Sequence, residues 1–112
     1  MEMKVSQFED ATLVELAGRL DTAGVSGIEA RFTATIVPKG RNAIVDLTKV
    51  DFLASLGIRM LISTGRALSG KGARLALFGA SPYVTEVLES TSLMEIIPLA
   101  DTPSEALALI TS

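Results

Sequence analysis

Residues 43–61 read AIVDLTKVDFLASLGIRML and join two kinds of hydrophobic pattern. The first five residues form a nearly continuous apolar run, which is typical of a strand that is covered on both faces. Residues 48–54 are more polar and are expected to form a loop. From about Leu56 to Leu68 the apolar residues follow a helical period, so this segment is predicted to be an amphipathic helix. The side chains predicted to face inward are Ile58, Leu61, Ile62, Gly65 and Leu68.

Two strands and a helix are predicted on the N-terminal side of this unit. Residues 5–8 and 12–17 are separated by a short polar turn, and strands this close in sequence can pair only antiparallel, as a hairpin. A helix is expected next, and either Asp21 or Thr22 can cap its start with a side-chain oxygen. Its predicted inward face, spaced at three and four residues, consists of Val25, Ile28, Phe32 and Ile36.

The C-terminal side repeats the alternation of strands and helices. Residues 75–78 and 95–99 are predicted strands. Ser81-Pro82 and the stretch 102–105, Thr-Pro-Ser-Glu, have the residue types of helix starts, with a proline at the first helical position. The predicted order is ββαβαβαβα, in a single domain over residues 1–112. This order predicts an α/β fold in which about four helices pack on a mixed, mostly parallel sheet.

The composition argues against most catalytic designs. The 112 residues include no Cys and no His, so disulfides, thiol chemistry, thiolate zinc sites and histidine general bases are excluded. No cofactor or metal is predicted, and a protein that is not an enzyme is expected. The net charge of −3 argues against direct binding of nucleic acid. Neither a targeting segment nor a membrane-length apolar run is visible, so a cytoplasmic protein without membrane insertion is expected.

Two weaker motifs have structural interpretations. Residues 65–72, GRALSGKG, nearly match a phosphate-binding loop, but Gly72 replaces the required hydroxyl residue and the segment ends a predicted helix instead of opening one. A glycine-rich helix end is the preferred interpretation. Asp21, Asp46 and Asp51 lie near strand ends, where ligands of α/β sheets gather, but taken singly they are interpreted as turn formers and helix caps.

Ser55 stands directly before the predicted helix and allows two interpretations. It is either an N-cap, whose hydroxyl accepts a hydrogen bond from a free amide, or a phosphorylation site. A helix N-terminus carries a positive partial charge, so it would tolerate the charge of about −1.5 to −2 that a phosphate adds. Such a modification would change the surface that a partner meets.

The stretch DLTKVDFLASLGIRML, residues 46–61, resembles the phosphorylation loop and following helix of STAS domains, in particular those of bacterial anti-sigma-factor antagonists. Residues 18–21, Gly-Arg-Leu-Asp, resemble a second signature of that family. The predicted order of elements is also the STAS order, so the resemblance covers nearly the whole chain. It implies that Ser55 is the phosphorylated serine, that Asp21 is the acidic residue beside it, and that Gly57 opens the helix.

The resemblance also implies partners. An unphosphorylated antagonist of this family binds an anti-sigma-factor serine/threonine kinase and so releases the sigma factor, phosphorylation reverses this, and a PP2C-type phosphatase is the expected partner for dephosphorylation. Two positions depart from the common pattern, because Ala54 removes a carboxylate beside the acceptor and Leu56 removes a second hydroxyl. These differences leave Ser55 as the acceptor and bear on which kinase acts and how efficiently.

The predicted partner surface is the outer face of the second helix. Arg59, Met60, Ser63 and Arg66 fall outside the predicted inward stripe, and methionine and arginine are enriched at protein interfaces. A merely solvated helix face is the alternative interpretation. The residues expected near the partner or its nucleotide are Asp21, Thr22, Ala54, Leu56, Gly57, Ile58, Arg59, Met60, Ser63 and Arg66.

Two other function classes stay open. The STAS resemblance also fits an accessory subunit of a membrane transporter, for example a lipid-transport ATPase, in which the domain docks and the serine need not be phosphorylated. An enzyme or nucleotide-binding domain is disfavoured by the lack of a phosphate loop, His and Cys. A monomer or weak dimer is expected, since the first strand can form an open sheet edge.

Overall fold

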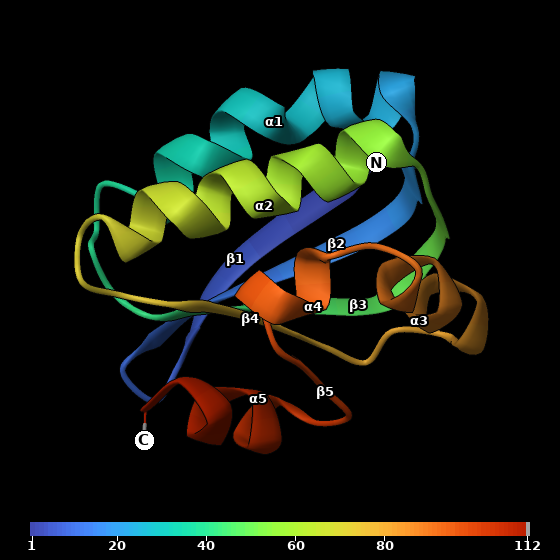
Figure 1. Ribbon diagram of the computed structural model, residues 1–112. Helices are drawn as coiled ribbons and strands as arrows, with labels where there is room; N and C mark the ends of the chain where they lie inside the picture. Colours follow the sequence, from blue (N-terminus) through green and yellow to red (C-terminus); the bar gives the residue numbers. More distant parts are fainter. Residues whose placement is uncertain (112) are drawn as a thin grey trace.

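The elements form a layered α/β structure, shown in Figure 1. The computed structural model describes residues 1–111. Its strands are β1 (Glu2–Phe8), β2 (Ala11–Leu20), β3 (Ala43–Leu53), β4 (Leu75–Phe78) and β5 (Leu99–Ala100). Its helices are α1 (Thr22–Ile36), α2 (Ser55–Ser69), α3 (Pro82–Glu89), α4 (Leu93–Ile96) and α5 (Pro103–Thr111).

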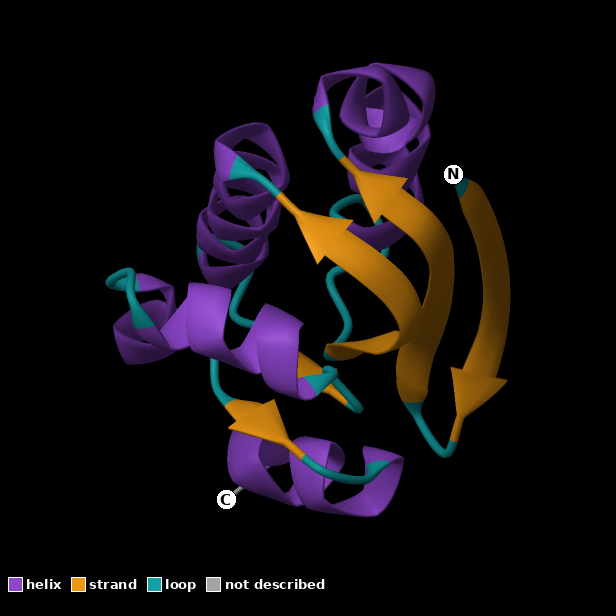
Figure 2. Ribbon diagram, turned by 90° about the vertical axis from the view of Figure 1, so that its right-hand side faces the viewer, coloured by secondary structure: helices purple, strands orange, loops and turns teal. Residues whose placement is uncertain are grey.

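The strands make one mixed sheet in the order β1-β2-β3-β4-β5. β1 and β2 pair antiparallel, with Val5 opposite Val14, which confirms the predicted hairpin. The later pairs are all parallel. In Figure 2 the strand that begins at the N-terminus forms one edge of the sheet, and the short strand beside α5 forms the other. The predicted mixed, mostly parallel sheet is therefore confirmed.

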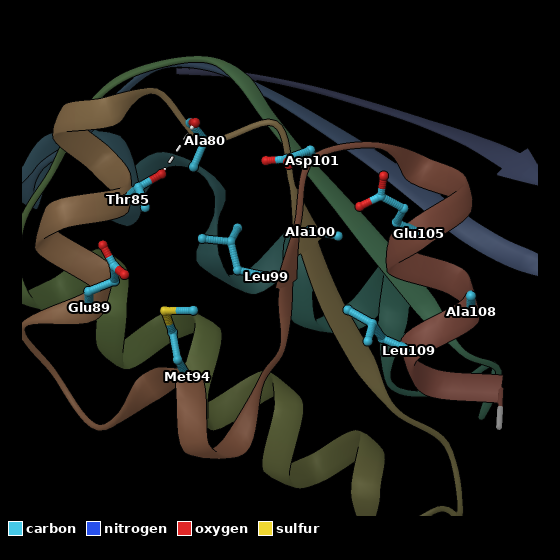
Figure 3. A pocket seen from close by; sticks show the side chains of 10 residues that line it. All are labelled: Ala80, Thr85, Glu89, Met94, Leu99, Ala100, Asp101, Glu105, Ala108 and Leu109. Carbon is cyan, nitrogen blue, oxygen red and sulfur yellow. Dashed lines mark hydrogen bonds between the residues drawn. The ribbon is translucent and has the colours of Figure 1, made fainter.

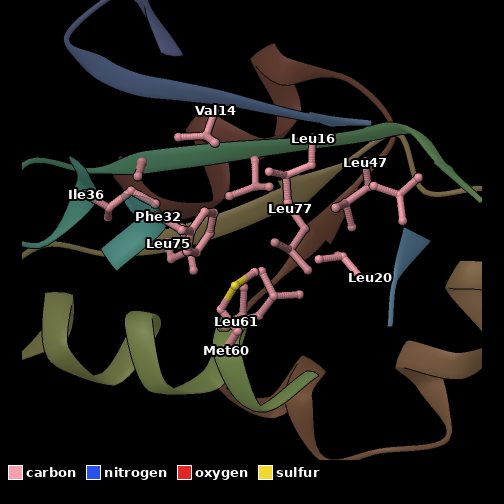
Figure 4. Packing of buried hydrophobic residues seen from close by; sticks show 14 of the residues in the cluster. Val14, Leu16, Leu20, Phe32, Ile36, Leu47, Met60, Leu61, Leu75 and Leu77 are labelled. Carbon is pink, nitrogen blue, oxygen red and sulfur yellow. The ribbon is translucent and has the colours of Figure 1, made fainter. Parts of the chain in front are cut away.

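The sheet has a larger core on one face and a smaller core on the other. α1 and α2 lie on one face and α5 lies on the opposite face (Figures 1 and 2). Val45 and Leu47 of β3 point into the larger core, while Ile44 packs in the smaller core against Ala106 of α5. This alternation explains why residues 43–47 are almost continuously apolar. The larger core, shown in Figure 4, includes Val14, Leu16, Leu20, Phe32, Ile36, Leu61, Leu75 and Leu77.

Three helices begin at polar residues expected from the sequence. The Gly24 amide donates to the Asp21 carboxylate at 2.9 Å at the start of α1. Ser81 caps α3, since its hydroxyl accepts from the Val84 amide at 3.2 Å and Pro82 takes the first helical position. At the start of α5, the Glu105 amide donates to the Thr102 hydroxyl at 3.2 Å. The sequence therefore predicts these three helix starts correctly, because a capping side chain bonds an amide only a few residues away.

β3 is longer than expected, and the prediction of a loop over residues 48–54 is wrong. The second half of β3 pairs with β2, with Ala17 opposite Lys49 and Leu20 opposite Leu53. β4 is shorter and pairs with β3 only as far as Asp46. Within residues 1–111 the extension of β3 therefore pairs with a strand on one side only. Its exposed Thr48, Lys49 and Asp51 interrupt the apolar pattern.

The predicted strand over residues 95–99 is also wrong. Residues Leu93–Ile96 form the one-turn helix α4, and β5 is confined to Leu99–Ala100. Leu93 and Ile97 are both buried, and their four-residue spacing matches a helical turn. Ile97 then becomes extended, with φ −125° and ψ 115°, as expected of a residue before proline. The order is thus ββαβαβααβα, with five helices in residues 1–111 instead of about four.

Candidate functional site

Ser55 is the first residue of α2, and the prediction that it caps this helix is wrong. The capping position belongs to Ala54, which is extended, and no side chain makes a capping hydrogen bond there. The helix begins early because the Ala54 carbonyl already accepts from the amides of Gly57 at 3.0 Å and Ile58 at 3.1 Å. Ser55 is exposed, so its hydroxyl lies at the surface on the first turn of the helix.

Gly57 lets the start of α2 approach the sheet. This glycine is buried, and a Cβ atom on it would lie 2.8 Å from Leu53 Cδ1 and 3.1 Å from the Leu20 carbonyl oxygen. The first distance is shorter than real Cβ atoms show and the second is tighter than most of their contacts, so any larger residue would require Leu53 to shift or α2 to move away from the Leu20 backbone. The glycine implied by the family resemblance thus has a steric reason in this chain.

Asp21 and Ser55 follow the ends of neighbouring strands. Leu20 pairs with Leu53, and the Ala54 amide donates to the Leu20 carbonyl at 3.1 Å. The carboxylate of Asp21 accepts from the Gly24 amide and, at 3.3 Å, from Nε of Arg19. The Gly24 amide is the main cause that holds the pKa of the Asp21 carboxyl below its ordinary value, and the Arg19 guanidinium acts in the same direction.

Arg19, Phe52 and Tyr83 stack on one another at this end of the sheet. The Arg19 guanidinium carbon lies 4.2 Å from the centre of the Phe52 ring, and Phe52 stacks on Tyr83 with 6.2 Å between ring centres. Tyr83 is 47% exposed. These contacts join β2, β3 and α3 and were not anticipated, because no periodicity in the sequence places Tyr83 beside Phe52.

The outer face of α2 carries a shallow groove that begins at Ser55. Arg59, Ser63 and Arg66 are exposed, as their spacing predicts. Within residues 1–111 neither arginine of this groove makes an ion pair, so no carboxylate offsets the positive charge that they place at the surface. We call this feature the α2 groove; its volume is about 440 Å³, and it is lined by Ser55, Ile58, Arg59, Ile62, Ser63 and Arg66.

Met60 does not belong to this surface, and its predicted exposure is wrong. Its side chain is completely buried, whereas Ile58 and Ile62, predicted to face inward, are only half-buried and line the α2 groove. The inward face is rotated because the small residues Gly57 and Thr64 also point inward. The buried residues of α2 are Gly57, Met60, Leu61, Thr64, Gly65 and Leu68.

Thr64 shows why the inward face was misjudged. It is a polar residue in sequence, but its hydroxyl lies 3.3 Å from the hydroxyl of Thr33 on α1. A hydrogen bond between two hydroxyls satisfies both groups, so a threonine pair can be buried between helices at little cost. The predicted inward stripe did not include Thr64 and was placed on Ile58 and Ile62 instead.

The other predicted residues lie at the starts of α1 and α2 and do not line the α2 groove. Thr22 is exposed at the start of α1, while Ala54 and Leu56 are half-buried at the start of α2. In residues 1–111 no group of three or more Asp and Glu residues could hold a metal ion. No helix in that range combines the length and apolar character needed to cross a membrane.

Known proteins are similar to this chain over most of its length. BtrV of Bordetella bronchiseptica, provisionally named an anti-sigma factor antagonist, is 25% identical over 108 residues, which cover 96% of this chain and 93% of BtrV. The anti-sigma-B factor antagonist of Listeria monocytogenes is 26% identical over 90 residues, covering 80% of this chain and 79% of that protein. An anti-sigma-factor antagonist (STAS) domain protein from Planctomyces limnophilus, solved as a structure, is 26% identical, with a TM-score of 0.84 and 98% of each chain covered. Since the STAS domain model matches residues 2–106, the chain belongs to the STAS domain family.

Proposed function

We propose that this protein is an anti-sigma-factor antagonist that is switched by phosphorylation of Ser55. The observation that supports this most directly is the exposed Ser55 at one end of a groove that also holds Arg59 and Arg66. The names of the relatives from Bordetella and Listeria point to the same function. The unphosphorylated protein would bind an anti-sigma-factor serine/threonine kinase and thereby release the sigma factor.

Charge explains how phosphorylation would end this binding. A phosphate adds about −1.5 to −2 charges, and Ser55 lies at the helix end where negative charge is favourable, so the fold would survive the modification. Arg59 follows Ser55 by four residues and therefore lies on the same side of α2. A phosphate there would offset the positive charge of the groove and weaken its attraction for an acidic partner surface.

The catalytic work in this scheme belongs to the partners. The kinase supplies ATP and the transfer machinery, and a PP2C-type phosphatase would remove the phosphate and restore binding. This chain contributes a hydroxyl and a docking groove, so it needs no cofactor and no catalytic side chain. We place the switch in the cytoplasm, where sigma factors act, and it works through protein contacts without direct binding of nucleic acid.

The test uses kinases encoded in the same genome. Each is incubated with the full chain and ATP, and the modified residue is mapped by mass spectrometry; we expect phosphate on Ser55. Ser55→Asp should abolish kinase binding measured by calorimetry, whereas the matched control Ser26→Asp, at an exposed position of α1, should not. Phosphate at another residue, or normal binding by Ser55→Asp, would overturn the switch. Capture of a transporter ATPase, with no kinase bound, would favour the accessory-subunit alternative.

A further inference from the structure

A second groove opens at the far edge of the sheet, where α3, α4, β5 and α5 meet. We call it the β5 groove; its volume is about 510 Å³, and Figure 3 shows the side chains that line it. It shares no residue with the α2 groove. Leu99 of β5 lies between Met94 and Leu109, which are 36% and 46% exposed. Exposed methionine and leucine at such levels leave apolar surface in contact with water.

The backbone of β5 is open on this side. The Leu77 amide of β4 donates to the Pro98 carbonyl at 2.9 Å, and the Gly79 amide donates to the Ala100 carbonyl at 3.2 Å. Because successive residues of a strand turn their backbone groups to opposite sides, the amide and carbonyl of Leu99 point away from β4. β5 is the last strand in the order, so no strand in residues 1–111 pairs with this edge.

The charge around the β5 groove has one sign. Its carboxylates come from three elements: Glu89 ends α3, Asp101 follows β5, and Glu105 lies in the first turn of α5. No Lys or Arg lines the groove, and within residues 1–111 none of the three carboxylates makes an ion pair. A ligand that fills this groove must therefore present positive charge beside an apolar surface.

We propose that the β5 groove binds an extended segment of a partner protein in which basic and apolar residues alternate. Strand addition at an open sheet edge uses main-chain hydrogen bonds for affinity and pockets for alternate side chains for specificity. Leu99 offers the backbone groups, Met94 and Leu109 offer apolar contact, and the carboxylates attract the Lys or Arg side chains. A two-residue edge offers few main-chain bonds, so this contact serves a transient partner.

The first test titrates a labelled full-length protein with the blocked pentapeptide acetyl-Lys-Val-Arg-Val-Lys-amide and follows backbone amides by NMR. We expect the largest shifts at Leu99, Asp101 and their neighbours. Glu89→Lys should weaken binding by about fivefold, as loss of an exposed charge pair would. This variant should fold normally, since a lysine at the C-terminal end of α3 suits the helix dipole. The matched control Glu29→Lys, on exposed α1 surface, should bind like the unmodified protein.

Four outcomes would overturn the proposal. The peptide could shift amides away from β5, or it could bind Glu89→Lys as well as the unmodified protein. A peptide in which every backbone nitrogen is methylated cannot donate a main-chain hydrogen bond to an edge strand, so equal binding by that peptide would exclude strand addition. If the same amides shift with protein concentration in the absence of peptide, the occupant is a second copy of the chain instead of a basic partner segment. None of these outcomes bears on Ser55, so they leave the phosphorylation switch to its own test.

Discussion

The amide of Ala54 donates a hydrogen bond to the carbonyl oxygen of Leu20 at 3.1 Å, and this bond joins the end of β2 to the start of α2. One residue beyond Leu20 lies Asp21, and one residue beyond Ala54 lies Ser55. Asp21 and Ser55 lie more than thirty residues apart in sequence, and this main-chain contact helps to bring the two signatures together. Their juxtaposition depends on backbone pairing and on the close approach of α2 to the sheet.

Gly57→Ala tests this close approach. The added methyl group would contact Leu53 and the Leu20 carbonyl at distances that require Leu53 or α2 to shift. We expect the free energy of unfolding to fall by about 1–3 kcal/mol, the usual cost of overpacking a core. Urea unfolding followed by circular dichroism measures this change.

Gly27→Ala is the matched control for that substitution. Gly27 also lies within a helix, but nothing lies within 4 Å of the position that its Cβ would occupy. Alanine is favoured over glycine in a helix, so this variant should gain up to about 1 kcal/mol. Two glycine-to-alanine changes of opposite sign would localise the constraint to Gly57, whereas equal effects would contradict it.

Arg59→Glu tests the α2 groove as a docking surface. Arg59 is exposed and makes no ion pair within residues 1–111, so reversing its charge should leave the urea midpoint nearly unchanged. The affinity for the cognate kinase should fall. The affinity of the variant should also depend less on salt concentration than that of the unmodified protein. Calorimetry at two ionic strengths checks both expectations, and an unchanged affinity would remove Arg59 from the interface.

Met60→Ala separates burial from docking on the same helix. Met60 is fully buried beside Arg59, so its truncation should reduce the free energy of unfolding by about 2–5 kcal/mol. At temperatures where the variant stays folded, its affinity for the kinase should match that of the unmodified protein. A stable Met60→Ala variant with weakened binding would contradict the burial of this side chain.

The sequence predicted those features that depend on neighbouring residues. The β1–β2 hairpin, the strand 43–47 and the caps Asp21 and Ser81 all follow from short-range patterns, and each is present. The misplaced features depend on distant partners. β3 extends because β2 continues beside it. The inward face of α2 includes Met60 and Thr64, and the Thr64 hydroxyl contacts that of Thr33 on α1. Phe52 stacks on Tyr83, which comes from the later helix α3.

Asp21→Asn tests the electrostatic part of the α1 cap. The pKa of Asp21 is lowered in the folded protein, chiefly by the Gly24 amide. The folded chain therefore stabilises the charged carboxylate of Asp21 relative to the protonated carboxyl. The stability that this provides is complete above the unfolded pKa of about 3.9 and is lost as the pH falls through the lower, folded pKa. Asparagine keeps the capping geometry but does not titrate, because its side-chain oxygen can still accept from the Gly24 amide.

The expected difference between the two proteins therefore appears only in acid. Melting temperatures measured from pH 7 to about pH 2.5 should fall less steeply below about pH 4 for Asp21→Asn than for the unmodified protein, because one proton-linked loss is removed. Thr22→Ala, an exposed change at the next residue, should keep the steeper acid dependence. If Asp21→Asn instead loses stability mainly near neutral pH, the negative charge of Asp21, which both the Gly24 amide and the Arg19 guanidinium favour, contributes more to this cap than its hydrogen-bond geometry. Parallel curves for all three proteins would show that Asp21 titrates alike in the folded and unfolded chain.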